Sequence, residues 1–114
     1  MSISPLEYLR HIRDEAPYLE KESLRFSKSE FAVNETAKRA FARSLEIIGE
    51  ASKKNPADFK QHHSNFDWRG MAGMRDRLIH DYFGVDYDIF WDVARNKAAT
   101  LRSDIEAILQ EYDS

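Results

Sequence analysis

Apolar residues recur at steps of three and four along most of this chain, the spacing that places them on one face of an α-helix. Few segments alternate apolar and polar residues as a half-buried β-strand does. With only 4 glycines and 3 prolines, the chain also has few residues that force a turn. We therefore predict an all-α fold, an up-down bundle of four or five helices, formed by a single domain over residues 1–114.

Capping residues and prolines set the expected boundaries of the first two helices. Ser4 is placed to cap a helix that has Pro5 in its first turn, and Pro17 should kink or end this helix. A second long helix should begin near residue 30 or 34 and run to residue 54, because Asn55 and Pro56 stop it there.

The second half of the chain is expected to hold two more helices. Residues 56–66 are interpreted as a polar connector that leaves His62 and His63 in solvent. The expected boundaries are Asp67 and His80 for the third helix, Gly84 for the break after it, and Asp86 and Leu109 for the last helix.

The composition excludes several classes of functional site. Without cysteine, the chain has no disulfide, no thiolate zinc site and no cysteine nucleophile. Glu7, His11 and Glu15 stand at steps of four, but no fourth ligand is predicted, so we interpret them as a solvated helix face. At 114 residues the chain is too short for a full Rossmann enzyme or a (β/α)8 barrel. We expect neither a metal nor a cofactor.

Targeting and membrane segments are not recognisable in the sequence. Its first residues lack the basic and apolar stretches of a secretory signal. The apolar runs fall far short of the roughly 20 residues that a membrane-spanning helix needs. We expect a soluble cytoplasmic protein with no membrane contact.

Charge is distributed unevenly along the chain. The net charge is −3, yet residues 51–80 carry 6 basic and 3 acidic side chains. Residues 81–114 carry 3 basic and 8 acidic side chains. Because an acidic protein is a poor general binder of nucleic acid, any RNA contact must come from the basic middle third.

Residues 73–83 bring together side chains that suit acid–base chemistry on an anion. Arg75 is permanently cationic, His80 titrates near neutral pH, and Tyr82 follows closely. Positions five apart on a helix differ by about 140°, so Arg75 and His80 act together only if the helix breaks between them or two copies meet there. Asp76 lies four residues before His80 and can accept its ring N–H. The same pattern also suits a histidine that satisfies the last carbonyls of a helix.

A second polar feature lies in the predicted second helix. Glu50 is a carboxylate within the mostly apolar segment 47–51, and it needs a partner if it is buried. We expect this partner to be an arginine of the third helix, and we expect Gly49 to allow close contact between the helices.

Together these residues resemble a known family. Arg75-x4-His80-x-Tyr82 is similar to the signature of HEPN-domain proteins, specifically of HepT-like toxins, and the similarity covers nearly the whole chain. One departure is that the family's last helix commonly carries a Leu-Pro step, where this chain reads Lys-Ala-Ala-Thr-Leu over residues 97–101. The other matching segments are 45–51, Trp68, 73–76, 78–82, Val85-Asp86, Ile89, Trp91 and the apolar pattern to Leu109.

The resemblance implies a HEPN-type bundle that acts as a metal-independent endoribonuclease toxin and as a homodimer. In such an enzyme the RNA 2′-hydroxyl attacks the neighbouring phosphate and leaves a 2′,3′-cyclic phosphate. His80 would be the general acid or base, Arg75 would stabilise the charge on the phosphorane, and Asp76 would orient one of them. Arg69 and Arg77 are expected to contact the RNA.

The resemblance also implies a regulatory partner. HepT-like toxins are encoded beside a nucleotidyltransferase antitoxin of the MntA type, in a type VII-like toxin–antitoxin pair. This partner transfers AMP from ATP to the motif tyrosine, here Tyr82. The added bulk and negative charge beside Arg75 and His80 would repel RNA.

Two other functions are compatible with the same fold. A non-catalytic HEPN module could serve as the docking partner of a nucleotidyltransferase, with the same fold and interface. The intact pair of Arg75 and His80 favours the enzyme, because a docking module needs neither. A plain helical scaffold leaves the pair unexplained.

Overall fold

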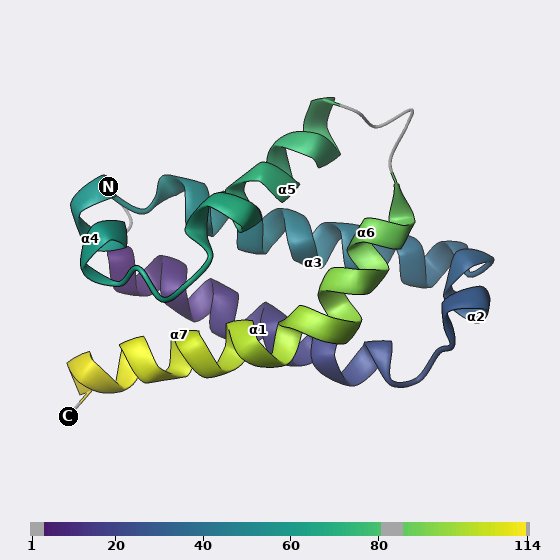
Figure 1. Cartoon of the computed structure of the whole chain (residues 1–114), viewed down its shortest axis with the longest axis horizontal. Coiled ribbons are helices and arrows are strands. Elements are labelled where there is room, and N and C mark those ends of the chain that lie inside the picture. The colour runs from purple at the N-terminus through teal and green to yellow at the C-terminus, as the bar shows by residue number, and fades with distance from the viewer. Residues whose placement is uncertain (1–3, 81–85, 114) are drawn as a thin grey trace.

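The long helices run back and forth along one axis, so that the start of α1 and the end of α7 lie at the same end of the bundle (Figure 1). This computed structural model describes residues 4–80 and 86–113, with the backbone alone at Ile79, His80 and Asp113. The described part of the chain contains helices and no strand, which confirms the predicted all-α, up-down fold. The elements are α1 (Pro5–Ser23), α2 (Lys28–Ala32), α3 (Glu35–Lys54), α4 (Ala57–His62), α5 (Trp68–His80), α6 (Tyr87–Asp92), a π-helical segment (Val93–Lys97) and α7 (Ala98–Asp113).

Side-chain caps start the helices where the sequence predicts them. Ser4 accepts a hydrogen bond from the Glu7 amide at 3.3 Å, although α1 lacks the reciprocal bond of a full capping box. Of the two predicted starts of the second long helix, the one at residue 34 is confirmed, because Asn34 caps α3. Residue 30 lies instead in the separate short α2, which a capping box of Ser27 and Glu30 begins. The remaining caps are Asn34 on the Ala37 amide, Asp67 on Gly70 and Asp86 on Asp88, each at 3.0 Å.

Pro17 does not end the first helix. α1 continues through it to Ser23. Leu9, Ile12 and Leu19 are fully buried on both sides of the proline, so packing of one continuous face outweighs the hydrogen bond that proline removes.

The predicted connector over residues 56–66 is partly wrong. It contains α4, and His63 is buried at 6% exposure, whereas His62 is exposed. The His63 ring stays satisfied because its Nε2 lies 2.7 Å from the Tyr112 hydroxyl of α7 and its face packs on Phe59. Local polarity could not reveal a contact between residues so distant in sequence.

The predicted last helix is interrupted by the π-helical segment. This segment ends at Lys97, the first residue of the stretch 97–101 in which the chain departs from the family's Leu-Pro step. Its Ala94 carbonyl accepts a buried hydrogen bond of 3.2 Å from the Ser23 hydroxyl of α1, so a tertiary contact supports the altered helix geometry. Gly84, the predicted break, lies outside the described residues.

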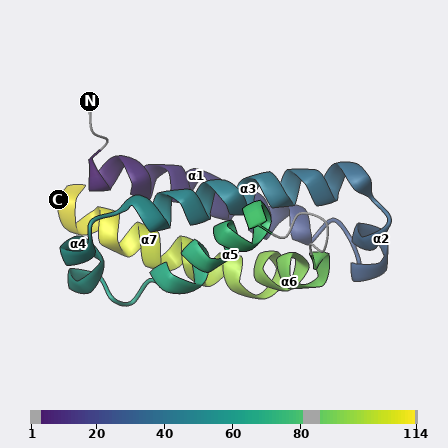
Figure 2. The ribbon, with the colours of Figure 1, turned by 90° about the horizontal axis from the view of Figure 1, so that it is seen from above.

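The core forms between α1, α3 and the C-terminal helices, while α5 packs mainly on α3 (Figure 2). Trp68 and Trp91 are both buried. None of the described helices is long and apolar enough to cross a membrane. The largest fully buried side chains are Leu9, Ile12, Leu19, Phe31, Phe41, Leu45, Ile48, Phe66 and Ile105.

Helices α3 and α5 touch backbone to backbone at Gly49, which confirms the predicted close contact. A Cβ atom at Gly49 would lie 2.6 Å from the Met71 carbonyl oxygen and would overlap the Cβ of Arg75. Gly73 of α5 differs, since a Cβ there would meet nothing within 4 Å among the described residues.

Gly49→Ala should therefore lower the free energy of unfolding by about 1–3 kcal/mol, because the added methyl group must push α5 away from α3. Gly73→Ala is the matched control, and we expect it to raise that energy by up to about 1 kcal/mol through helix propensity. Urea unfolding followed by circular dichroism measures both. A Gly49→Ala variant as stable as the native chain would show that the close contact is not required.

Candidate active site

The predicted site residues occupy different sides of α5. Arg75 and Asp76 lie beside α3 and are partly exposed, while Arg69 and Arg77 are exposed and form no ion pair within the described residues. His80 is the last residue of α5. Tyr82, the predicted modification site, lies outside the described residues.

Arg75 is held in place by two carboxylates. Its Nε donates a hydrogen bond of 2.6 Å to Glu50 Oε2, and its Nη1 donates one of 3.2 Å to Asp76 Oδ1. The first bond confirms the predicted pairing of Glu50 with an arginine of the third helix. These two bonds use two of the five N–H donors of the guanidinium, and the other three form no hydrogen bond within the described residues.

Asp76 orients Arg75 and joins α5 to α3. Besides Arg75, its Oδ1 accepts a hydrogen bond of 2.9 Å from Lys53 Nζ. The bond to Arg75 fits one of the two predicted roles for Asp76, and the side chain of His80, the partner in the other role, lies outside the described residues. Sequence reasoning missed Lys53, although its place three residues after Glu50 on α3 signals that both can face α5.

The charge pairing keeps these groups ionised. Hydrogen bonding to Asp76, with a further contribution from Glu50, raises the pKa of Arg75 above its ordinary value. Hydrogen bonds from Lys53 and then from Arg75 lower the pKa of Asp76. Burial alone would raise the pKa of Glu50, but hydrogen bonds from Lys54 and Arg75 outweigh burial and lower it. The cluster of these five side chains, hereafter the Arg75 cluster, carries three cations and two carboxylates.

Helix α5 constrains how Arg75 and His80 can cooperate. It is α-helical from Trp68 to His80, so no helix break lies between the two residues. Within one chain their positions therefore differ by about 140° around the helix axis. Of the two arrangements that would let them act together, a meeting of two copies remains.

Groups suited to metal binding are not found. Within residues 4–80 and 86–113, no three or more His, Asp or Glu side chains are arranged to hold a metal ion. Glu7, part of the helix face considered above, instead pairs with Arg10 at 2.9 Å.

Comparison with known proteins gives one consistent result. The family model for HepT-like ribonucleases matches residues 6–108. A protein of Caldanaerobacter subterraneus subsp. tengcongensis named "Putative RNase" is 43% identical over 108 residues, which cover 95% of this chain and 96% of that protein. The "Probable ribonuclease HepT" of Thermococcus cleftensis is 38% identical over 108 residues, covering 95% and 98%. A "Putative RNase" of Methanocaldococcus jannaschii is 43% identical over 84 residues, covering 74% and 69%. No solved structure shows a significant match.

The lowered pKa values of Glu50 and Asp76 predict a dependence of stability on pH. Their stabilising contribution is present above the unfolded-state values near 4 and is lost as pH falls through the lower folded-state values. The free energy of unfolding should therefore fall less between pH 6 and pH 3 in Glu50→Gln/Asp76→Asn than in the native chain. Urea unfolding at several pH values measures this.

The matched control is Asp14→Asn/Glu15→Gln, which removes two carboxylates of α1 outside the Arg75 cluster. It should keep the native dependence on pH. If both double variants flatten the dependence equally, the Arg75 cluster makes no special contribution to acid sensitivity.

Proposed function

This chain belongs to the HepT-like ribonuclease family and is an endoribonuclease, and we propose that it cleaves RNA without a metal ion, through attack of the 2′-hydroxyl on the adjacent phosphate. The observation that carries the proposal is the Arg75 guanidinium, fixed 2.6 Å from Glu50 on the helix that ends at His80. A preorganised cation of this kind stabilises the negative charge that develops on a phosphorane.

The reaction needs one proton removed and one supplied. The 2′-hydroxyl loses its proton as its oxygen bonds to phosphorus, and the 5′-oxygen of the next nucleotide takes up a proton as its bond to phosphorus breaks. His80 serves as general acid or base in these transfers, a role worth roughly 10²–10⁴-fold in rate. The products are a 2′,3′-cyclic phosphate and a free 5′-hydroxyl. Since the nucleophile belongs to the substrate, no bound metal is needed to generate it.

A homodimer completes the proposed site. Two copies related by a two-fold axis, with their α5 helices facing each other, would bring the Arg75 of one copy toward the His80 of the other. In support of a second copy, α5 is α-helical from Trp68 to His80, so Arg75 and His80 of one chain lie about 140° apart around the helix axis (Figure 2 shows α5 beside α3).

Control by a nucleotidyltransferase antitoxin is part of the proposal. Tyr82 follows α5 by two residues, so an AMP group transferred to it would place a phosphate close to the end of that helix. The added negative charge would oppose binding of the RNA phosphate. The alternative function, a non-catalytic docking module, needs no ordered cation such as Arg75.

Purified protein in EDTA should cleave single-stranded RNA and leave 2′,3′-cyclic phosphate ends, and His80→Ala should lower the rate by about 10²–10⁴-fold. Mass spectrometry of the products measures both. Sedimentation should show a dimer for the native and His80→Ala proteins alike. A strict need for a divalent metal, or an active monomer, would contradict the proposal, and a native dimer without any cleavage would favour the docking module.

Co-expression with the adjacent nucleotidyltransferase should add AMP to Tyr82, which intact-mass and peptide mass spectrometry detect. Tyr82→Phe should escape modification and stay toxic in the presence of the partner, because phenylalanine lacks the hydroxyl that accepts AMP. A neutralised complex with unmodified Tyr82 would mean that the partner acts by covering the site.

A further inference from the structure

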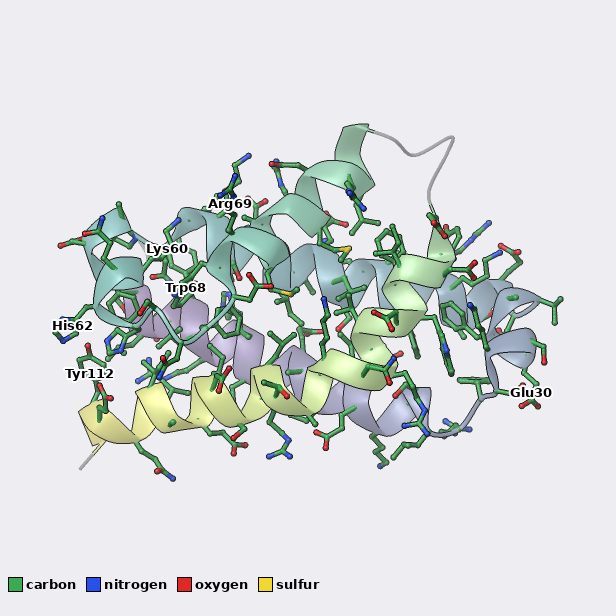
Figure 3. All side chains as sticks on the ribbon, viewed as in Figure 1. Glu30, Lys60, His62, Trp68, Arg69 and Tyr112 are labelled. Atoms are coloured by element: carbon green, nitrogen blue, oxygen red, sulfur yellow. The ribbon has the colours of Figure 1, made fainter. Side chains whose placement is uncertain are left out.

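Three adjoining surface hollows meet around Arg69, where α4 leads into α5. Each has a volume of about 510–550 Å³, and Arg69 lines all three. Lys60 of α4 and the edge of Trp68 line two of them, and Gly73 lines two. Figure 3 shows Lys60, Trp68 and Arg69 gathered at this junction. We call these three hollows together the Arg69 hollows.

The Arg69 hollows are basic on a chain that is acidic overall. Lys60, Arg69 and Arg77 line them, and neither arginine is paired within the described residues. The carboxylates among the lining residues already have partners. Asp67 accepts the Gly70 amide at the start of α5, and Asp76 is bound by Lys53 and Arg75. Two cations without an ion-pair partner in residues 4–80 and 86–113, beside carboxylates that already have partners, favour an anionic ligand.

Between Arg69 and Arg77, α5 has a glycine, Gly73, on its exposed side. Glycine inside a helix lowers stability by about 1 kcal/mol relative to alanine. At Gly49 a glycine is required, because α5 leaves no room for a side chain there. At Gly73 packing does not require a glycine, because none of the described atoms lies within 4 Å of where a Cβ would be. Gly73 therefore lets a ligand come close to the α5 backbone, although packing within the described chain does not need a glycine at this position.

The hollows share a side of α5 with the end of the helix. Successive intervals of four and seven residues separate Arg69, Gly73 and position 80. Each interval is close to a whole number of helical turns, so the three positions lie on nearly the same face of α5. At a rise of 1.5 Å per residue, Arg69 lies about 16 Å before position 80 along the axis. A strand whose reacting phosphate sits near the end of α5 can therefore run over Gly73 to reach Arg69.

We propose that the Arg69 hollows are a second RNA-binding subsite, which takes the phosphates of nucleotides flanking the cleaved bond. Lys60 and Arg69 bind these phosphates, Gly73 lets the strand approach α5, and Gln61, Ser64 and Asn65 offer hydrogen bonds to sugars or base edges in one hollow. This subsite rests on the proposed ribonuclease function. With it, the enzyme would prefer single-stranded RNA several nucleotides long as its substrate.

Lys60→Gln/Arg69→Gln tests the subsite, with Lys21→Gln/Arg95→Gln as the control that removes one exposed lysine and one exposed arginine elsewhere. Each pair is made in the His80→Ala background, and the probe is a labelled single-stranded RNA of about 12 nucleotides. Fluorescence anisotropy gives Kd as a function of salt. Each lost phosphate contact should reduce the slope of log Kd against log salt by about 0.7, so the test pair should lose about 1.4 and the control almost nothing.

Kinetics of the same pairs with an intact His80 separate the subsite from the chemistry. The test pair should raise KM for the RNA of about 12 nucleotides by a larger factor than it raises KM for a dinucleotide. Equal slopes for the test and control pairs would overturn the subsite even if native protein cleaves RNA. If the test pair reduces the slope but the native protein cleaves no RNA, the subsite stands and the proposed ribonuclease function is rejected. Unchanged RNA binding with lost neutralisation by the nucleotidyltransferase would assign the surface to that protein.

Gly73→Ala provides a second variant that cannot fail through misfolding, because it should stabilise the helix. It should weaken binding of the same RNA several-fold while sedimentation shows the native assembly. Native affinity in Gly73→Ala would remove glycine from the subsite, and a changed assembly would place Gly73 between copies of the chain.

Discussion

The ion pair between Glu50 of α3 and Arg75 of α5 is the contact on which the arrangement of the candidate site depends. Its oxygen and nitrogen lie 2.6 Å apart, and Gly49 brings the two helix backbones close enough for this distance. Both side chains are partly shielded from solvent, so each compensates the other for the hydration that its charge loses. Asp76 and Lys53 extend the pair into a network that ties α5 to α3 at a second point.

This contact also fixes the rotation of α5 about its own axis. With Arg75 turned to α3, Met71 and Met74 are buried and Leu78 packs against the core. The remaining side of the helix then presents Arg69 and Arg77 outward. One helix thus holds a paired cation beside its neighbour and, on its exposed side, two cations that form no ion pair within the described residues. That division suits an enzyme that must both stabilise a reacting phosphate and attract a polyanion.

Several features were predictable because they depend on neighbours in sequence. The caps at Ser4, Asn34 and Asp67 are set within three residues, and the helical spacing of apolar residues gives the bundle. Glu50 was predictable for another reason, since a carboxylate in an apolar segment demands a cation wherever the fold supplies one. Features that depend on partners distant in sequence were not predictable. His63 is buried because Tyr112 meets it from the other end of the chain.

The sequence by itself determined the all-α class, the family and the residue types at the site, because periodicity, caps and motif spacing are local properties. Only the tertiary structure decided that Pro17 stays inside a helix, that the last helix contains a π-helical segment, and that Lys53 joins Asp76 to complete the Arg75 cluster. In each case the deciding energy comes from packing or pairing between segments that the chain brings together only on folding. Local propensity is too weak to outweigh such contacts.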